Sequence, residues 1–375
     1  MALTVRAVRT ARDLKEFVRF PFRVYGEHPC WVPPLLLDEI ETFTPSKNPA
    51  YEDADSRQFL AYRDGSLVGR VAAILSRGAN RKYGAANLRF GWFECLDDVE
   101  AARALFGEVE KWARELGMTT ITGPHGFCDL DPNGLLVEGF GELGTLTGNY
   151  NHPYYPGLVE AAGFEKEVDY VEFTCRPPAA GLPQKLERLL ERVRRQSTFR
   201  IVPFRTNKEV AARAREIFHL LNETFEEVWG TVPLTDRQIG YYVKKYIPYV
   251  DPALIKVVVD ESDVMIGFLL TMPSLSRPLQ RARGRLFPFG WFWILRGLKE
   301  RETLDFLLAG VRKDYRGVGV DLLMIADILR SATERGFVRS ESNQELETNA
   351  RIQAFWRYFD PVQHKRRRVY TKPLE

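Results

Sequence analysis

The residues best suited to chemistry lie between positions 311 and 323, in the run Val-Arg-Lys-Asp-Tyr-Arg-Gly-Val-Gly-Val-Asp-Leu-Leu. An apolar segment typical of a strand ends at Val311, a basic glycine turn follows, and an amphipathic helical pattern begins directly after the turn. Glycines let a backbone approach an anion, and the free N–H groups at a helix start point toward it with the positive end of the helix dipole behind them. The run therefore predicts a binding site for a phosphate or pyrophosphate group.

Charged side chains in the same run agree with an anionic ligand. Arg312, Lys313 and Arg316 add positive charge, and a guanidinium donates to phosphate oxygens in a fixed fork. A second interpretation stays open, in which the run is an ordinary helix start with solvated arginines and no ligand.

The spacing of apolar residues predicts the same order of elements in both halves of the chain. The first half has a strand at 3–8, a helix ending near 24, a hairpin at 58–75, a strand at 87–95, a helix at 99–116 and a strand at 118–123. The second half has a strand at 200–204, a helix at 210–221, a hairpin at 254–271, a strand at 304–311 and a helix at 322–335. Because the order repeats, we predict duplication of one α+β unit.

A chain of 375 residues has the length of two domains. A break in the pattern falls at Pro177-Pro178 and Gly181, and a charged helical segment follows at 183–195. We predict an N-terminal domain at 1–178, a linker with a charged helix at 179–198, and a C-terminal domain at 199–375.

Composition excludes some classes of function. There are 53 Lys and Arg residues against 50 Asp and Glu, a net charge of +3, which gives no general case for nucleic-acid binding. The cysteines form no C-x-x-C pair and the five histidines no H-E-x-x-H motif, so we expect reduced thiols and no metal. The N-terminus has no apolar core long enough for a signal peptide, and no apolar run in the chain reaches the length of a membrane span. We expect a cytoplasmic protein.

The segment Tyr315-Arg316-Gly317-Val318-Gly319, after a strand ending at Val311, resembles the coenzyme A motif of GNAT acyltransferases. The pattern of that motif is Arg or Gln, two residues, Gly, one residue, then Gly or Ala, and Arg316 and Gly319 match it. Asp321 departs from it, since Gly or Ala is usual there. Its carboxylate either weakens coenzyme A binding or turns away as a capping group of the helix.

A second resemblance lies near the end of the chain. Glu347-Thr348-Asn349 and the segment 350–359 resemble the last helix of the GNAT fold, where Asn commonly contacts the cofactor. Many GNAT enzymes place a Tyr general acid seven residues after that Asn, but Trp356 stands here, with Tyr358 two residues on. Residues 368–370 resemble the closing strand of the fold. The resemblance implies that coenzyme A contacts Val311, Arg312, Arg316, Gly317, Val318, Gly319, Val320 and Asn349.

The first half resembles the same unit without its phosphate loop. After the strand Phe90 to Cys95, Asp97 and Asp98 occupy the helix start. Their negative charges satisfy the helix dipole and would repel a pyrophosphate. We therefore predict that the first half binds no cofactor.

The whole chain resembles a group of bacterial tandem GNAT proteins that includes the bacterial ceramide synthases. The segments that carry this resemblance span nearly all of the sequence, at 31–35, 90–95, 134–140, 150–155 and 286–291. It implies an α+β fold of two GNAT-like units in tandem, each a mixed, mainly antiparallel sheet flanked by helices. It also implies acyl-CoA as the donor substrate.

An N-acyltransferase is the function that these features imply. An amine would attack the carbonyl carbon of the coenzyme A thioester, and a base must take the proton of the amine. Asp305 and Glu347 are the candidate bases in the second half, Glu94 is the candidate if the first half takes part, and Tyr358 is a candidate acid. The sequence leaves the amine unidentified. Two alternatives stay open: a non-catalytic module that binds acyl-CoA or lipid, and an interaction scaffold.

Two further segments each have two interpretations. The loop 123–134 contains His125, a candidate base, and Cys128, a candidate nucleophile; it either contacts substrate or only connects elements. The segment from Arg277 to Lys299 has no acidic residue and surrounds an aromatic run at 287–293 with Arg and Lys. It is either an insertion packed on the core or a contact with an anionic membrane or lipid at the inner face.

Overall fold

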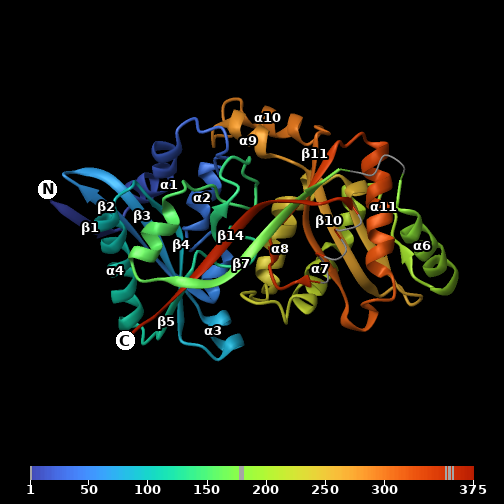
Figure 1. The fold of residues 1–375 in the computed structure, drawn as a ribbon, viewed down its shortest axis with the longest axis horizontal. Helices are drawn as coiled ribbons and strands as arrows, with labels where there is room; N and C mark the ends of the chain where they lie inside the picture. The colour runs from blue at the N-terminus through green and yellow to red at the C-terminus, as the bar shows by residue number, and fades with distance from the viewer. Residues whose placement is uncertain (1, 177–180, 351–352, 354–355, 357–358) are drawn as a thin grey trace. The chain divides into compact units, whose positions relative to one another are not determined.

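The fold is described by a computed structural model that covers residues 2–176, 181–350, 353, 356 and 359–375. The chain forms two compact units, and each contains segments from both halves of the sequence (Figure 1). Unit 1 comprises Met1–Val171, Leu275–Ile294 and His364–Glu375, and unit 2 comprises Glu172–Ser274 and Leu295–Gln363.

The sheet of unit 1 has the strand order β1-β2-β3-β4-β5-β14, and β6 pairs with β14. These strands are β1 (Leu3–Ala7), β2 (Ala54–Arg63), β3 (Ser66–Ser76), β4 (Asn87–Cys95), β5 (Thr120–Gly123), β6 (Leu135–Glu138) and β14 (Val362–Pro373). All of these pairs are antiparallel except β4 with β5. The turn between β2 and β3 uses positive φ angles at Asp64 and Gly65, as a tight hairpin requires.

Helices cover the sheet of unit 1. They are α1 (Ala11–Tyr25), α2 (Leu36–Thr42), α3 (Arg77–Tyr83), α4 (Val99–Glu115), α5 (Tyr155–Ala161), α9 (Ser276–Ala282) and α10 (Gly290–Gly297), with a 3-10 turn at Pro49–Glu52. The unit 1 segment ends at Ile294, so the last residues of α10 belong to unit 2. The apolar face that the sequence predicts for α4 is buried: Phe106 packs edge-on against Phe90 of β4. Burial of one such side chain contributes about 1.5–3 kcal/mol.

The sheet of unit 2 has the strand order β12-β11-β10-β9-β8. These strands are β8 (Arg200–Ile201), β9 (Ile255–Val259), β10 (Met265–Pro273), β11 (Thr303–Val311) and β12 (Arg339–Ser342), with β13 (Glu345–Leu346) outside this order. The helices are α6 (Gln184–Gln196), α7 (Asn207–Thr224), α8 (Asp236–Tyr246) and α11 (Val320–Glu334), with 3-10 turns at Ile247–Tyr249, Pro252–Leu254 and Lys313–Tyr315. Within the described part of the chain, no helix is long and apolar enough to span a bilayer.

The two units repeat one plan, so the predicted α+β fold with mixed, mainly antiparallel sheets is confirmed. In each unit, the only parallel pair among the described strands joins the fourth strand to the fifth, β4 to β5 and β11 to β12. Each fourth strand also carries a bulge. Arg70 pairs with Glu94 but Ala72 with Gly91, and Leu270 pairs with Leu308 but Thr271 with Phe306. Bulges of this kind re-aim backbone groups and are common beside functional sites.

Each unit takes its closing strand from the other half of the sequence. β14 lies antiparallel to β5 in unit 1, with Tyr370 opposite Gly123, and the end of β7 (Glu165–Cys175) pairs with β12 in unit 2, with Cys175 opposite Ser340. Residues 368–370, which resemble the closing strand of the fold, therefore lie in a strand that closes the sheet of unit 1, although they fall within the C-terminal domain predicted at 199–375. Strand pairing depends on contacts between distant residues, which residue order does not reveal.

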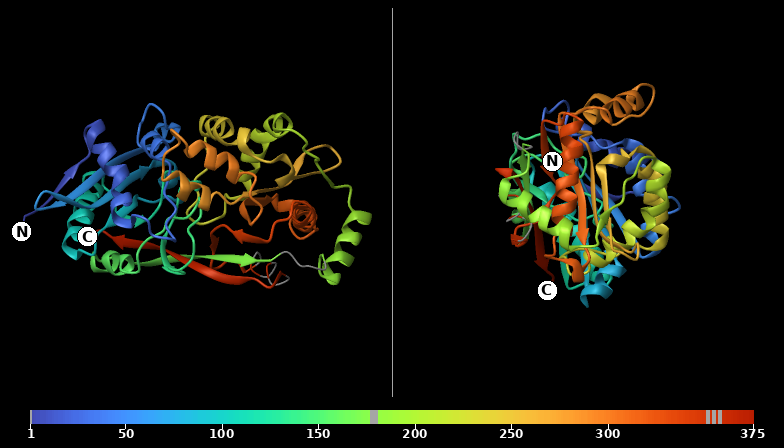
Figure 2. Two further views of the ribbon diagram at one scale, coloured as in Figure 1. Left: turned by 90° about the horizontal axis from the view of Figure 1, so that it is seen from above. Right: turned by 90° about the vertical axis from the view of Figure 1, so that its right-hand side faces the viewer.

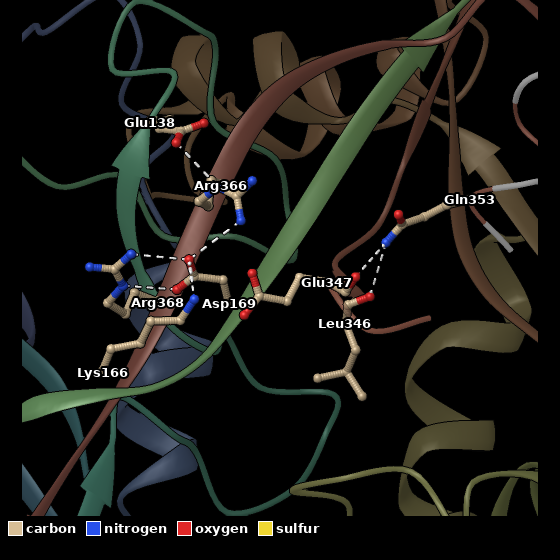
Figure 3. A network of polar contacts seen from close by, with 8 residues as sticks. All are labelled: Glu138, Lys166, Asp169, Leu346, Glu347, Gln353, Arg366 and Arg368. Carbon is tan, nitrogen blue, oxygen red and sulfur yellow. Dashed lines mark hydrogen bonds and ion pairs between the residues drawn. The ribbon is translucent and has the colours of Figure 1, made fainter. Parts of the chain in front are cut away.

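Asp169, which is almost fully buried, holds β14 in unit 1 through an ionic network with partly exposed basic partners (Figure 3). Its carboxylate accepts hydrogen bonds from Arg368 Nε at 2.8 Å and Nη2 at 3.1 Å, and it also pairs with Arg366 and Lys166. Arg366 also pairs with Glu138 of β6 at 3.1 Å. Burial raises the pKa of Asp169, but the hydrogen bonds from Arg368 and Lys166 outweigh it and leave the pKa below its usual value.

Candidate functional site

The predicted phosphate loop lies between β11 and α11 of unit 2. A 3-10 turn at Lys313–Tyr315 follows β11, and Gly317 and Gly319 then adopt φ angles of 81° and 99°. Gly319 is the residue that precedes the first turn of α11. No described residue accepts a hydrogen bond from the N–H of Gly317, Val318 or Gly319, and the Val318 side chain is 48% exposed. Gly317 is also exposed, whereas Gly319 is buried, so the loop presents backbone donors at Gly317 and Val318 at the start of a 15-residue helix.

Gly319 also has a packing role that the sequence does not indicate. A Cβ atom there would overlap the side chain of Val193, a buried residue of α6. Val193 belongs to an apolar cluster with Leu322 and Leu323 of α11. The absence of a side chain at 319 therefore lets α6 pack against α11, and its positive φ angle also favours glycine.

The basic side chains of the loop already have partners. Arg316 Nε donates to the backbone oxygen of Val311 at 3.1 Å, which ties the loop to β11. Lys313 Nζ lies 2.8 Å from Glu227, an ion pair that raises the pKa of Lys313 and lowers that of Glu227. Arg312 stacks on the Tyr315 ring at 4.7 Å. An anion bound here would therefore compete with Glu227 for Lys313.

For Asp321, the geometry favours the capping alternative. Its Oδ1 accepts a hydrogen bond from the backbone N–H of Leu322 at 2.9 Å. The carboxylate thus satisfies one of the donors at the helix start that lack an intrahelical acceptor.

The edge of β11 becomes more exposed where β12 leaves it. Parallel pairing ends at Phe306 and Ser342, while β11 continues to Val311. Thr303, Leu304 and Asp305 are buried, whereas the residues after them are partly or fully exposed. Asn343 follows β12 and donates its side-chain amide to the backbone oxygen of Leu307, the bulged residue, at 3.0 Å. An extended ligand could therefore lie along 308–311 and reach the loop.

The predicted catalytic residues of the second half lie in different surroundings. Asp305 is buried in β11, opposite Glu341 of β12. Glu347 is half-buried, and its backbone oxygen accepts a hydrogen bond from Gln353 Nε2 at 3.1 Å (Figure 3). Asn349, predicted to contact the cofactor, donates its N–H to the backbone oxygen of Leu346. Tyr358 lies outside the described residues.

Glu345 is a candidate that the sequence did not reveal. Trp356 Nε1 donates to its Oε1 at 2.6 Å, and the Trp356 ring packs edge-on against Phe306, where β12 leaves β11. Burial raises the pKa of Glu345 to about 7, against the lowering effects of Trp356 and Ser342. A carboxylate with a pKa near neutrality suits a general base. The only sequence signal is Trp356, at the position where many GNAT enzymes have Tyr.

Glu94, the candidate of the first half, is buried in β4 of unit 1. It accepts hydrogen bonds from Tyr25 and, at 2.7 Å, from Tyr155, and its other oxygen lies 3.7 Å from Arg70. Burial raises the pKa of Glu94. Nearby, the indole N–H of Trp92 donates a hydrogen bond to Glu39. Burial raises the pKa of Glu39 to about 7. Its contacts give Glu94 a role in the core of unit 1, and its role in catalysis stays a prediction.

The helix start of α4 in unit 1 differs from that of α11. Asp98 precedes the first turn of α4 and accepts a hydrogen bond from the N–H of Ala101 at 3.0 Å. Arg63 donates to both Asp98 oxygens, at 2.7 and 2.8 Å, and these bonds lower the pKa of Asp98. The place that corresponds to the phosphate loop thus already holds a paired carboxylate.

The loop at 123–134 is packed into unit 1. His125 and Cys128 are both buried. Asp131 Oδ2 accepts hydrogen bonds from the N–H groups of Phe127 and Cys128, which fixes the turn. Burial, together with Arg89, lowers the pKa of His125 to about 3, so its ring is neutral at physiological pH. These contacts favour a structural role over contact with substrate.

No protein-family model matches the chain, but solved structures share its fold. A tandem GNAT protein from the clavulanic acid biosynthesis pathway matches with a TM-score of 0.57 at 14% identity, over 99% of this chain and 98% of that one. A GCN5-related N-acetyltransferase from Sphaerobacter thermophilus matches with a TM-score of 0.52 at 13% identity, over 99% and 95%. The chain has the fold of a tandem GNAT protein.

Within this class the chain is similar to two curated proteins along its whole length. Protein YghO of Escherichia coli is 28% identical over 99% of this chain and 95% of its own. Bacterial ceramide synthase of Caulobacter vibrioides is 26% identical over 99% of this chain and 98% of its own. The chain therefore resembles the bacterial tandem GNAT group that includes bacterial ceramide synthase.

Proposed function

We propose that the protein is an N-acyltransferase that moves an acyl group from acyl-CoA to an amine, with its site in unit 2. The observation that carries the proposal is the set of N–H groups from Gly317 to Gly319 that no described residue accepts, at the start of α11; Gly317 and Val318 are exposed and Gly319 is buried. Such a helix start binds phosphate through backbone donors and the helix dipole. The pyrophosphate of coenzyme A would bind here, and its acyl arm would follow the exposed end of β11 toward Phe306.

The chemistry needs few groups from the protein. A neutral amine attacks the thioester carbon, the C–S bond breaks, and the sulfur leaves as a thiolate. The amine nitrogen loses one proton, which we assign to Glu345, with Asp305 and Glu347 as the other candidates. A thiol with a pKa near 8.5 leaves without a strong acid, so Trp356 in place of Tyr is compatible with transfer.

The acceptor is proposed to be a lipid amine of the sphingoid type. This rests on the name of the relative from Caulobacter vibrioides, a bacterial ceramide synthase that covers 99% of this chain. A lipid acceptor would be met at a membrane surface, so we propose a cytoplasmic protein that contacts the inner face of the membrane.

Binding of acyl-CoA without transfer is the second candidate function. Trp356 favours it, because it replaces the residue that serves as acid in many GNAT enzymes and its N–H is already bonded to Glu345. Incubation with labelled acyl-CoAs of several chain lengths and a panel of amines, sphingoid bases included, separates the two functions. Transfer predicts a labelled amide; binding alone predicts retention of label without product.

The loop is tested by Val318→Glu, with Val338→Glu as its matched control. Both valines are exposed, at 48% and 62%, and they lie near opposite ends of α11, a helix about 22 Å long. A carboxylate at 318 would repel the pyrophosphate, so we expect acyl-CoA affinity to fall roughly tenfold or more. Calorimetry should show unchanged affinity for Val338→Glu. Equal affinities for both variants would show that the loop is not the phosphate site.

A further inference from the structure

The segment Leu275–Ile294 belongs to unit 1, although the residues before and after it in the sequence, Glu172–Ser274 and Leu295–Gln363, form unit 2. Gln280 Nε2 donates to the backbone oxygens of Pro29 and Trp31, at 2.8 and 2.9 Å. The N–H of Leu36 donates to the oxygen of Gly284 at 2.9 Å, and a Cβ atom at 284 would overlap Phe22. The base of the segment is therefore fixed to unit 1 by specific contacts.

The tip of the segment points its rings away from the core. Phe287 and Phe289 are 73% and 72% exposed, and Trp291 and Phe292 are 46% and 47% exposed. We call these four residues the aromatic tip. Figure 2 shows α10, which carries two of them, as an orange helix outside the sheet. Two hydrogen bonds close the turn: Trp291 donates its backbone N–H to the oxygen of Leu286 and its indole N–H to the oxygen of Pro288.

An exposed cluster of this size needs a physical explanation. Exposed aromatic rings gathered at one place mark a surface that meets another partner. A packed insertion explains the contacts of Gln280 and Gly284 but not the exposure of the tip. Both alternatives from the sequence therefore hold in part: the base is packed, and the tip is not.

Charge around the aromatic tip indicates which partner fits. The segment from Arg277 to Lys299 contains basic residues and no acidic one. Arg283 pairs with Glu27 at 2.7 Å, and both side chains are largely exposed. Arg285 is exposed beside the tip. Rings bury at the boundary of headgroups and acyl chains while arginines meet anionic headgroups.

We propose that the aromatic tip docks the protein on an anionic lipid bilayer, with its rings in the interfacial layer and Arg283 and Arg285 against the headgroups. This deepens the proposed function, because a lipid amine is met at that surface. Docking itself requires neither coenzyme A nor acyl transfer. Its failure can therefore be told apart from failure of the proposed function.

The test is co-sedimentation of the full chain with vesicles of phosphatidylcholine, alone or mixed with phosphatidylglycerol. Phe287→Ser with Phe289→Ser should reduce binding to the mixed vesicles at least tenfold, because two inserted rings are lost. The matched control replaces Tyr246 and Tyr249 by Ser. These are also exposed aromatics, at 46% and 57%, but they belong to unit 2. The control should bind like the wild type.

The charge is tested by Arg283→Gln with Arg285→Gln, compared with Arg77→Gln and Arg81→Gln. Arg81 pairs with Asp53 at 2.7 Å and so matches the pair of Arg283 with Glu27. The first double variant should lose roughly tenfold or more in binding at low salt and less at high salt. Val318→Glu should sediment like the wild type, and the variants of the tip should keep their acyl-CoA affinity.

Three outcomes would overturn the docking proposal. One is a wild-type protein that does not sediment with mixed vesicles, and another is equal sedimentation of the wild type and both tip variants. The third is a dimer that forms in solution and is lost in the variant of Phe287 and Phe289. That result would assign the aromatic tip to a second copy of the chain.

Discussion

At the scale of single residues, the surroundings of Glu345 differ from those of the other candidate bases. Asp305 lies within the paired part of β11, and Glu94 is enclosed by Tyr25, Tyr155 and Arg70. Glu345 accepts a hydrogen bond from Trp356, whose ring packs on Phe306 at the point where the pairing of β11 with β12 ends. Its raised pKa means that it can accept a proton near neutral pH and still ionise.

Glu345→Gln should reduce kcat/KM by about 10²–10⁴-fold and remove the rise of activity with pH near 7. The wild type should gain activity as Glu345 ionises through that pKa. Steady-state rates between about pH 5.5 and 8.5, roughly 1.5 units to either side of neutrality, measure this change. If the pH dependence survives in Glu345→Gln and disappears in Asp305→Asn or Glu347→Gln, the base is Asp305 or Glu347, respectively.

A stability measurement separates this role from a structural one. Burial raises the pKa of Glu345 from 4.5 to about 7, so the folded state binds the proton more tightly than the unfolded state. Ionisation of Glu345 therefore lowers the free energy of unfolding as pH rises from 4.5 to about 7. Urea unfolding above pH 7 should show Glu345→Gln to be no less stable than the wild type.

At the scale of elements, the closing strand of unit 1 depends on an ionic network. Asp169 is almost fully buried and offsets the charges of Arg366, Arg368 and Lys166. Asp169 is the buried member of this network, and its removal leaves the charges of Arg366 and Arg368 without compensation, which costs more than the ion pairs contribute. β14 should therefore be sensitive to Asp169 although that residue lies on β7.

Asp169→Ala should lower the free energy of unfolding of unit 1 by about 3–5 kcal/mol. Glu138→Ala is the matched control, since Glu138 pairs with Arg366 from a 58% exposed position and should cost less than about 1 kcal/mol. Hydrogen exchange locates the effect, with β5 expected to lose protection together with β14. Loss of protection confined to β11 and β12 would contradict the assignment of β14 to unit 1.

At the scale of the whole molecule, one fold occurs twice with different helix starts. In unit 2, α11 begins after a glycine loop whose N–H groups have no acceptor among the described residues. In unit 1, α4 begins at Asp98, which already bonds to Ala101 and Arg63. An anion at the start of α4 would face the carboxylate of Asp98, which Arg63 holds in place. Duplication of the fold therefore does not imply two phosphate sites.

Titration of the full chain with coenzyme A should therefore give a stoichiometry of one per chain. Val318→Glu should weaken that single event, while Asp98→Ala should leave affinity unchanged and only destabilise unit 1, by about 1 kcal/mol through loss of the cap. The measurement is calorimetry at a protein concentration well above the dissociation constant. Two binding events per chain, or loss of binding in Asp98→Ala, would place a site in unit 1.

Much of the fold could be predicted from local patterns. The hairpin at Asp64-Gly65, the amphipathic helix at 99–116 and the strand, glycine turn and helix at 304–335 each follow from residues close together in the sequence. Their order also predicted the duplication. The predicted phosphate loop depends on glycine spacing and on the start of a helix, both of which are local features.

Tertiary structure decided what depends on distant residues. The pairing of β14 with β5, the packing of Val193 on Gly319 and the exposure of Phe287 and Phe289 have no local signature. Glu345 became a candidate only when folding placed Trp356 against it, because burial and a partner far along the chain set its pKa. Periodicity and turn chemistry act over a few residues and so are readable from sequence, whereas strand exchange, burial and pKa follow from which surfaces come together.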